Sequence, residues 1–374
     1  FRFLMETEKL TFPEAVRLLA ERAGIPIPQR RPETAAEARL RAALLEIHEA
    51  ATAFFRRQLE SGEGGEARAY LERRGVAPEM AAEFRLGYAP ASGSSLLRHL
   101  EGRFSPDLLE ASGLVLKRDT GGHFDRFRRR LIFPISNEAG KVIAFGGRAL
   151  SEEDQPKYLN SPETAIYRKS RVLFNYHRAR EAMRREERAV LVEGYMDAIA
   201  LYWAGVKNVV ASCGTSLTPL QVKMLAPLAK TVVVNYDPDA AGSAATERSL
   251  GTLLEEDLQA RVLALPAGLD PDDFIRQRGA DAYRVQLASA PPFFTFLVDR
   301  ARARFDLSTP GGRAEAARHL LQYVNRLPDR IERAEMASDL ADRLGLDRQV
   351  VGREVAAAAA ALSLIHISEP TRPY

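Results

Sequence analysis

The chain has 374 residues, of which 46% are hydrophobic and 28% charged, which is enough for two or three globular domains with cores of their own. No apolar run approaches the roughly 18 residues that a membrane span requires, and no secretory signal is visible. The single cysteine, Cys213, argues against an internal disulfide or a cysteine-rich zinc site and fits a reducing compartment. Because the chain begins with Phe1 instead of Met, we expect it to be a fragment of a longer protein.

The net charge of +3 conceals an uneven distribution. Between Lys117 and Arg188 there are 17 Lys and Arg against 10 Asp and Glu, a local balance of +7. The rest of the chain therefore carries −4. A bias towards arginine throughout the chain is the alternative explanation for any single Arg, but it explains the clustering less well.

The first half reads as helices followed by strands. The stretch "TFPEAVRLLAERAG" has a cap at Thr11 and a stop at Gly24, and the prolines after it indicate a linker. Residues 34–60 have helical spacing and predict one long helix, and residues 66–116 predict several short ones. Within the basic segment, "RLIFPI" and "KVIAFGGRAL" predict two strands joined by a hairpin turn.

From Arg188 strands and helices alternate strictly. "AVLVEG", "VKNVVAS", "TVVVNYD" and "ARVLALP" predict four strands, each followed by a helical pattern. Such alternation indicates a parallel sheet with right-handed crossovers. Residues 290–361 show helical periodicity only and carry no evident chemistry.

Acidic residues follow three of these four strands. They are, in chain order, Glu193 and Asp197, then Asp237 and Asp239, then Asp270, Asp272 and Asp273. Ligands bind at the carboxyl edge of such sheets. A pair of like charges about 4 Å apart costs roughly 4 kcal/mol at an effective dielectric near 20. Taken alone, Asp239 is typical of a helix N-cap and Asp197 of a partner for the helix dipole. Three groups in register predict instead a shared site for a hard cation, Mg²⁺ or Mn²⁺.

A cation-binding acidic edge beside a basic surface suits two reactions. Nucleotidyl transfer and phosphodiester cleavage both use ions to neutralise charge at phosphorus, and basic side chains hold the nucleic acid backbone.

Several phrases resemble one known family. Glu193-Gly194 with Asp237-x-Asp239-x-x-Gly242 is the TOPRIM pattern, and "VEGYMDAIAL", "LDPDDFIRQRG", "RFRRRLIFPI", "VIAFGGRAL" and "PKYLNSPET" resemble the RNA-polymerase core of bacterial DnaG-type primases. The resemblance covers about residues 34–361. It implies an α/β fold in which a TOPRIM parallel-sheet domain is flanked by a basic α+β N-terminal subdomain and a C-terminal helical bundle. The boundaries it suggests are a zinc-domain remnant at 1–27, a linker at 28–36, the basic subdomain at 37–187, TOPRIM at 188–285, helices at 286–361 and a non-native tail at 362–374.

The resemblance also implies roles for individual residues. The catalytic residues would be Glu193, Asp237 and Asp239. Two or more Mg²⁺ or Mn²⁺ ions would be held by Glu193, Asp197, Asp237, Asp239, Asp270 and Asp272. Template and nucleotide would be gripped by Arg126, Arg128, Arg148, Lys157, Tyr158 and Lys169. Taken singly, Lys157 and Lys169 are typical of solvated lysines, Tyr158 of a half-buried strand residue, and Gly146-Gly147 of a turn.

Partners and missing parts follow from the same resemblance. We expect synthesis of short RNA primers on single-stranded DNA from ribonucleoside triphosphates, in the bacterial cytoplasm, with single-stranded DNA-binding protein as a possible further partner. The zinc-binding domain, with its Zn²⁺, and the domain that binds the replicative helicase are expected to lie outside this chain. "LSLIHISEPTRPY" resembles a translated sequencing adapter and is excluded from the fold.

Four other functions are alternatives to a primase. A haloacid-dehalogenase-like phosphatase needs Thr or Val soon after the second acid, where this chain has Ala240 and Ala241. A TOPRIM nuclease or topoisomerase would cleave or relax DNA, and a catalytically idle module would bind single strands without divalent ions. A fused primase-helicase would need G-x-x-x-x-G-K-[ST], which does not occur in the chain.

Overall fold

The computed structural model describes residue 19 and residues 34–119, 121–214, 216–237, 240–266 and 268–357. The chain divides into one unit up to residue 42 and a second from residue 43 onwards, and the second carries everything discussed below. Apart from residue 19, the helix expected before residue 27 lies outside the described residues, as do the tail at 362–374 and Asp239. Among the described residues, no helix is both long and apolar enough to cross a membrane.

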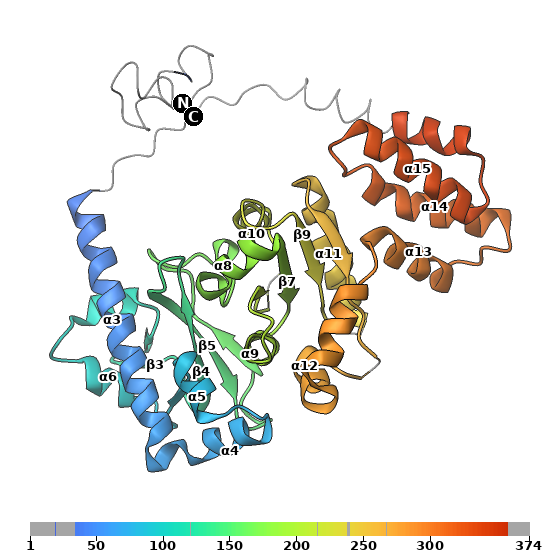
Figure 1. The fold of residues 1–374 in the computed structure, drawn as a ribbon. Coiled ribbons are helices and arrows are strands. Elements are labelled where there is room, and N and C mark those ends of the chain that lie inside the picture. The colour runs from blue at the N-terminus through green and yellow to red at the C-terminus, as the bar shows by residue number, and fades with distance from the viewer. Residues whose placement is uncertain are drawn as a thin grey trace, which may run out of the picture. The chain divides into compact units, whose positions relative to one another are not determined.

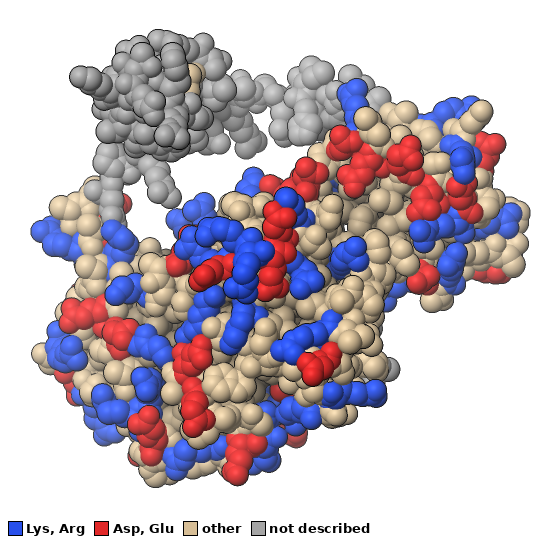
Figure 2. Space-filling view, in the orientation of Figure 1, with Lys and Arg blue, Asp and Glu red and all other residues tan. Residues whose placement is uncertain are grey.

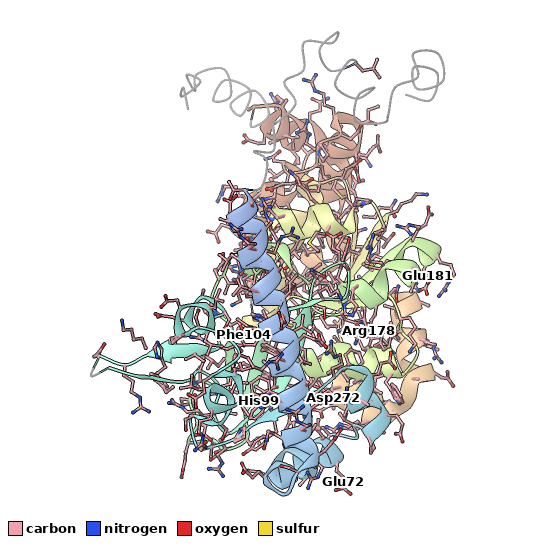
Figure 3. All side chains as sticks on the ribbon, turned by 90° about the vertical axis from the view of Figure 1, so that its left-hand side faces the viewer. Glu72, His99, Phe104, Arg178, Glu181 and Asp272 are labelled. Carbon is pink, nitrogen blue, oxygen red and sulfur yellow. The ribbon has the colours of Figure 1, made fainter. Side chains whose placement is uncertain are left out.

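The first part of the chain combines helices with an antiparallel sheet (Figure 1). The expected long helix is confirmed as α3 (Ala35–Glu60). His99 of α6 stacks on Phe54 of α3, with ring centroids 5.0 Å apart (Figure 3). The other helices are the 3₁₀ turn η1 (Gly62–Gly64), α4 (Gly65–Arg73), α5 (Pro78–Glu83), α6 (Ser95–Leu100) and α7 (Pro106–Ala111). The strands are β1 (Gly87–Ala89), β2 (Val115–Lys117), β3 (His123–Asp125), β4 (Arg130–Ser136), β5 (Val142–Ala149) and β6 (Tyr158–Asn160).

The predicted hairpin is confirmed as β4 and β5, which pair antiparallel at the centre of the sheet order β1-β4-β5-β6. Its turn is closed by Asn137, whose Oδ1 accepts hydrogen bonds from the N–H groups of Ala139 and Lys141. Gly146 lies inside β5 and not in a turn. A Cβ at Gly146 would stand 2.5 Å from the hydroxyl oxygen of Tyr195, so only glycine allows this approach.

The second sheet is parallel, as the alternating pattern predicts. Its strands are β7 (Arg188–Val192), β8 (Val209–Ala211), β9 (Thr231–Val234) and β10 (Gln259–Val262), in the order β10-β9-β7-β8. The helices that follow them are α9 (Tyr195–Trp203), α10 (Pro219–Leu225), α11 (Ala240–Glu255) and α12 (Pro271–Ser289). Because the chain leaves neighbouring strands β7 and β9 at one edge, the acids after them are brought together.

The edge strand β8 is covered by a segment that precedes the sheet in sequence. Phe174 and Ala211 form an antiparallel bridge, with N–H to O distances of 2.9 and 3.2 Å. After the short turn η2 (Lys169–Arg171), helix α8 (Tyr176–Glu186) places Ala179 and Met183 in the same core cluster as Ala189 and Leu191 of β7. The end of the basic segment therefore packs as part of the parallel-sheet layer.

The last described elements are α13 (Phe293–Arg304), α14 (Pro310–Val324) and α15 (Arg330–Leu344). Thr309 and Asp329 cap α14 and α15 by accepting backbone N–H bonds. Glu247 of α11 ties these helices to the sheet layer, because it accepts from Arg300 Nε at 2.7 Å and from Tyr323 Oη at 3.1 Å.

A buried histidine in α3 gives the fold a pH dependence. His48 is fully buried, its Nδ1 bonds to the carbonyl oxygen of Leu44 at 2.7 Å, and its ring stacks on Phe145. Burial lowers its pKa to about 4, against 6.5 for an ordinary histidine. The unfolded chain therefore takes up the proton first, so stability is intact above pH 6.5 and falls as pH drops towards 4.

We expect this group to cost about 3 kcal/mol of unfolding free energy across that window, at 1.36 kcal/mol per pKa unit. Measuring urea unfolding between pH 7.5 and 4 tests it. His48→Phe, which keeps the stacking and removes the titration, should show a shallower loss than the parent. Equal slopes for the two proteins would contradict the assignment. His177, whose pKa burial also lowers to about 4, contributes equally to both and leaves the comparison valid.

Candidate active site

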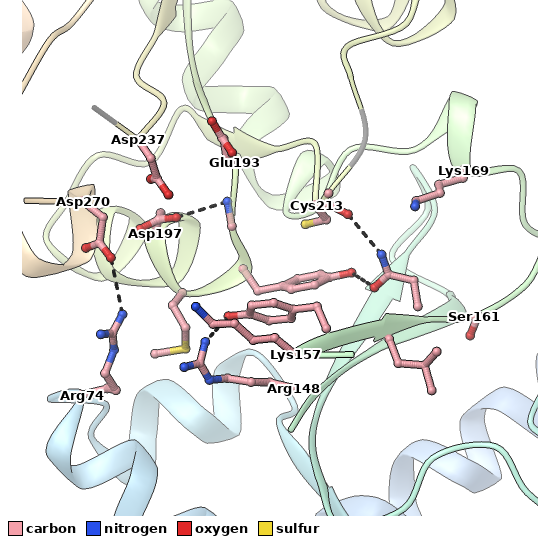
Figure 4. Close-up of a pocket in the computed structure, with 17 residues that line it drawn as sticks. Arg74, Arg148, Lys157, Ser161, Lys169, Glu193, Asp197, Cys213, Asp237 and Asp270 are labelled. Carbon is pink, nitrogen blue, oxygen red and sulfur yellow. Dashed lines mark hydrogen bonds and ion pairs between the residues drawn. The ribbon is translucent and has the colours of Figure 1, made fainter. Parts of the chain in front are cut away.

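One cavity of about 490 Å³ opens between the antiparallel sheet and the carboxyl edge of the parallel sheet (Figure 4). Acidic side chains line one side, and arginine, lysine and tyrosine side chains line the other. Its volume lies in the range of small-molecule sites. The residues that line it and are used below are Arg74, Arg148, Lys157, Tyr158, Asn160, Lys169, Glu193, Tyr195, Asp197, Cys213, Asp237 and Asp270.

Four of the predicted acids meet at this cavity. Glu193 follows β7, Asp197 lies in the first turn of α9, Asp237 follows β9, and Asp270 is the N-cap of α12. The convergence that the strand-end positions predict is therefore present. Asp239 lies outside the described residues, so its place relative to these acids stays a prediction.

Two of these acids also fix helix ends, whereas the N-cap expected at Asp239 lies outside the described residues. Asp197 accepts backbone hydrogen bonds from Gly194 at 3.1 Å and from Asp272 at 3.3 Å. Asp270 accepts one from Asp273 at 2.6 Å, which caps α12. The same carboxylates thus fix the ends of two helices and present charge to the cavity, and the two interpretations are not exclusive.

Burial and mutual repulsion make this edge electrostatically unfavourable on its own. The pKa of Asp197 is raised to about 8, first by burial and then by the negative charges of Asp270, Asp237 and Asp272. A nearby cation would favour the charged form and reverse this shift.

A further acidic cluster extends the edge. Oxygens of Asp270, Asp272 and Asp273 lie within 4.8 Å of one another. Asp272 is 1% exposed, and burial raises its pKa to about 6 although Arg74 and Arg276 oppose that shift. Neither of its oxygens accepts a hydrogen bond of ordinary geometry from a described residue. An all-carboxylate set with such a buried member suits a hard divalent cation, and Asp273 joins the set that the sequence predicted.

The opposite side of the cavity is cationic. Arg148 donates from Nη1 to the hydroxyl of Tyr158 at 2.7 Å, and its guanidinium lies 4.8 Å from the ring centroid of Tyr70. Held between two aromatic rings, Arg148 is fixed in place before any ligand arrives. Lys157 and Lys169 also line the cavity.

Two predicted cations lie elsewhere. Arg126 donates two hydrogen bonds to the backbone oxygen of Asn160, at 3.0 and 3.3 Å, and so holds β6 in position. Arg128 is exposed and lies over the ring of Phe124. Neither lines the cavity as the described residues form it. Their predicted contact with the template stays a prediction.

The sequence interpretation missed two residues of this site. Arg74, which follows α4, reaches the third acidic group, and nothing in "LERRG" distinguishes it from Arg73. Asn160 accepts a hydrogen bond from Tyr195 Oη at 2.7 Å and donates from Nδ2 to the carbonyl oxygen of Cys213 at 3.1 Å. Asn160 lies in the "PKYLN" motif that the sequence analysis singled out. The motif alone did not indicate that Asn160 bridges Tyr195 and Cys213.

Part of the basic balance belongs to another surface. Figure 2 shows Lys and Arg side chains gathered over the region of α8, with acids among them. This helix carries Arg178, Arg180, Arg184 and Arg185. On the ribbon in Figure 3, Arg178 and Glu181 mark this helix. The positive charge of the segment is therefore not confined to the cavity, and α8 carries part of it.

Family models match two successive parts of the chain. Residues 54–180 match the family model "DNA primase catalytic core, N-terminal domain", and residues 190–275 match "Toprim-like". The DNA primase of Halalkalibacterium halodurans is 40% identical over 359 residues, which is 95% of this chain and 60% of that protein. The chain spans between half and three fifths of the length of the first curated relatives it matches.

A DNA primase domain from Pseudomonas aeruginosa, solved by crystallography, is 35% identical with a TM-score of 0.78 and is matched over 84% of this chain and 99% of that one. The chain belongs to the bacterial DnaG primase family. A structure described as the DnaG primase catalytic domain bound to single-stranded DNA also matches, with 35% identity, a TM-score of 0.74, and coverage of 83% of this chain and 99% of that chain. The fold class expected for a DnaG catalytic core is thereby confirmed.

One expectation is wrong. The helicase-binding domain of the DnaG family was expected to lie outside this chain, yet residues 294–349 match the family model "DnaB-helicase binding domain of primase". These residues cover most of α13 and all of α14 and α15. Because helical periodicity without a polar motif is common to many bundles, the sequence pattern alone did not distinguish this region.

Proposed function

We propose that this chain is a DNA-dependent RNA polymerase core that makes short RNA primers without a pre-existing end on single-stranded DNA. The observation that carries the proposal is the meeting of at least four carboxylates with Arg148, Lys157 and Lys169 at one cavity. Joining a triphosphate to a hydroxyl uses both the metal-binding carboxylates and the basic side chains, because negative charge accumulates on the phosphoryl oxygens as the bond forms.

Roles within the cavity follow from chemistry and position. Glu193, Asp197, Asp237, Asp270 and Asp272, with Asp239, would hold two or more Mg²⁺ or Mn²⁺ ions, which supply charge neutralisation and an activated oxygen when bound. Arg148, fixed against Tyr70 and Tyr158, orients a phosphate group. Lys157 and Lys169 bind the triphosphate or the template strand, and Glu193 is a candidate acceptor for the proton of the attacking hydroxyl.

The partners of the chain are proposed from the comparisons with known proteins. A similar catalytic domain is described as bound to single-stranded DNA, which supports that template for this chain. Residues 294–349 are proposed to contact a DnaB-type helicase. The proposed place of action is the bacterial cytoplasm, where template, nucleotides and helicase occur together.

The decisive experiment supplies single-stranded template, four ribonucleoside triphosphates and Mg²⁺ without any primer. We expect short RNA to appear, and to disappear when Mg²⁺ is chelated. Cleavage of the template or relaxation of supercoiled DNA, with no RNA made, would favour a TOPRIM nuclease or topoisomerase instead.

The cationic side of the cavity yields a second test. Lys157→Ala or Lys169→Ala should raise the KM for nucleotide by about tenfold, the size of one lost charge-assisted contact. Lys141→Ala is the matched control, because Lys141 is an exposed lysine of the same subdomain outside the cavity. Steady-state kinetics over a nucleotide series measures the effect. If all three substitutions change KM equally, the contribution is general charge and not local contact.

A further inference from the structure

The third acidic group of the cavity already holds a cation that belongs to the protein. Arg74 lies within 4 Å of all three carboxylates: Nη2 is 2.5 Å from Asp272 Oδ2 and 3.8 Å from Asp270 Oδ2, and Nη1 is 3.7 Å from Asp273 Oδ1. Arg276 contacts Asp272 from the other side, with Nε 3.6 Å from Oδ1, and pairs with Asp273. Figure 4 shows Arg74 reaching Asp270 at the edge of the cavity.

Position explains why this arginine, and not its neighbour, reaches the acids. Arg74 is the C-cap residue of α4, and its side chain is 23% exposed. Arg73, one residue earlier, is exposed, and its backbone oxygen meets Arg276 at 3.5 Å. The two arginines have the same charge and sit next to each other, but only Arg74 enters the cluster.

Arg74 occupies the space that a divalent ion would need. An ion that touches carboxylates of this group must lie about 2.0–2.1 Å from each ligand oxygen if it is Mg²⁺. The guanidinium stands between the same oxygens, at 2.5 Å from the most buried one. Both cations cannot fill that position together. When Arg74 leaves, Asp272 keeps only the more distant Arg276, at 3.6 Å from Oδ1, so its Oδ2 needs another cation because a poorly compensated buried charge is unfavourable.

We propose that Arg74 is an exchangeable counter-ion of the Asp270–Asp272–Asp273 cluster. It neutralises the cluster when no divalent ion is there and leaves it when an ion binds. Arg74 also lines the cavity, so the released guanidinium stays beside the site. Tyr70, one helical turn before Arg74, already packs against Arg148. The released positive charge therefore remains available to a phosphate group that enters the cavity.

The proposal deepens the metal-dependent function above, and direct measurement of ion binding separates the two. The probe is Mn²⁺, followed by isothermal titration calorimetry and electron paramagnetic resonance on the full chain without nucleotide. Arg74→Gln should tighten the Kd of the cluster for Mn²⁺ by about tenfold, since one charge-assisted contact no longer has to be broken. Arg73→Gln, the same change of charge at the adjacent residue, should leave the Kd unchanged.

Two further variants localise the effect. In an Asp272→Asn background, Arg74→Gln should tighten binding much less, because the nearest of the three carboxylates is gone. Arg74→Lys, which keeps the charge with fewer bonds, should give an intermediate Kd and guards against misfolding of the Gln variant. Thermal unfolding should show Arg74→Gln less stable than Arg73→Gln without metal, with the gap narrowed by Mn²⁺.

The proposal is overturned if the wild-type chain binds Mn²⁺ and Arg74→Gln binds it equally or more weakly. It is also overturned if the full tightening persists in the Asp272→Asn background, because the effect then does not depend on the closest contact of Arg74. Failure of primer synthesis with Mn²⁺ binding and exchange intact would instead count against the proposed function alone.

Discussion

Asp237→Asn is expected to reduce ribonucleotide incorporation by about a thousandfold, the scale seen when one electrostatic element of a transition state is removed. Asp237 follows β9 and lines the cavity beside Asp197 and Glu193. An amide keeps the shape of the side chain but carries no charge, so an ion held there binds more weakly. The measurement is incorporation of labelled nucleotide on single-stranded template at saturating Mg²⁺.

Stability separates this loss from unfolding. The charge of Asp237 contributes to the raised pKa of Asp197, so removing it relieves repulsion in the metal-free protein. The melting temperature of Asp237→Asn should therefore equal or exceed that of the parent. Asp281→Asn is the control, because Asp281 is an almost fully exposed acid of α12 whose surface ion pair contributes little. If Asp237→Asn kept the activity of the parent protein, the catalytic role assigned to Asp237 would be wrong.

Gly242→Ala is expected to be nearly as damaging, for a geometric reason. Gly242 lies in the first turn of α11, and a Cβ there would stand 2.2 Å from the backbone oxygen of Asp237 and 3.0 Å from Glu193 Oε1. Backbone cannot yield as a flexible side chain does, so Ala must push Asp237 and α11 apart. A displacement of about 1 Å in a reacting group costs about a hundredfold in rate.

The matched control uses the same substitution in the same helix. At Gly251 a Cβ would meet only the guanidinium of Arg326, at 2.7 Å, which is the mobile end of a side chain. Gly251→Ala should keep full activity, and the higher helix propensity of Ala adds up to about 1 kcal/mol of stability. Incorporation rates and unfolding of the two variants, measured together, make the comparison. If Gly242→Ala is as active as Gly251→Ala, the close approach is not required for function.

The parallel sheet and the convergence of the acids could be predicted from the sequence, because both follow from local patterns. Strand-helix alternation fixes a parallel sheet, and the carboxyl ends of β7 and β9 are neighbours in it. The sequence pattern alone therefore predicts that Asp197 and Asp237 lie close together. The hairpin of β4 and β5 follows in the same way from two apolar runs and the Asn137 turn.

Contacts between segments that are distant in the chain could not be predicted from the sequence. Arg74 meets Asp272 only because the end of α4 and the first turns of α12 come close in space, and no spacing rule links residues 198 positions apart in the chain. Arg126 shows the converse: it belongs to a basic motif, yet it serves the backbone of β6. Gly146 looked like a turn residue, and its function, room for Tyr195, became apparent only when the partner was in place.

The bridge between Phe174 and Ala211 bears on how the catalytic layer can be isolated. An uncovered edge strand offers free N–H and C=O groups to other chains and is a common origin of aggregation. Phe174 occupies those groups on Ala211 of β8, and α8 covers apolar surface next to β7. A recombinant piece that starts at Arg188 would lose both protections and should precipitate. One that starts before Val172 keeps them, so the smallest well-behaved version of this layer includes the last part of the basic segment.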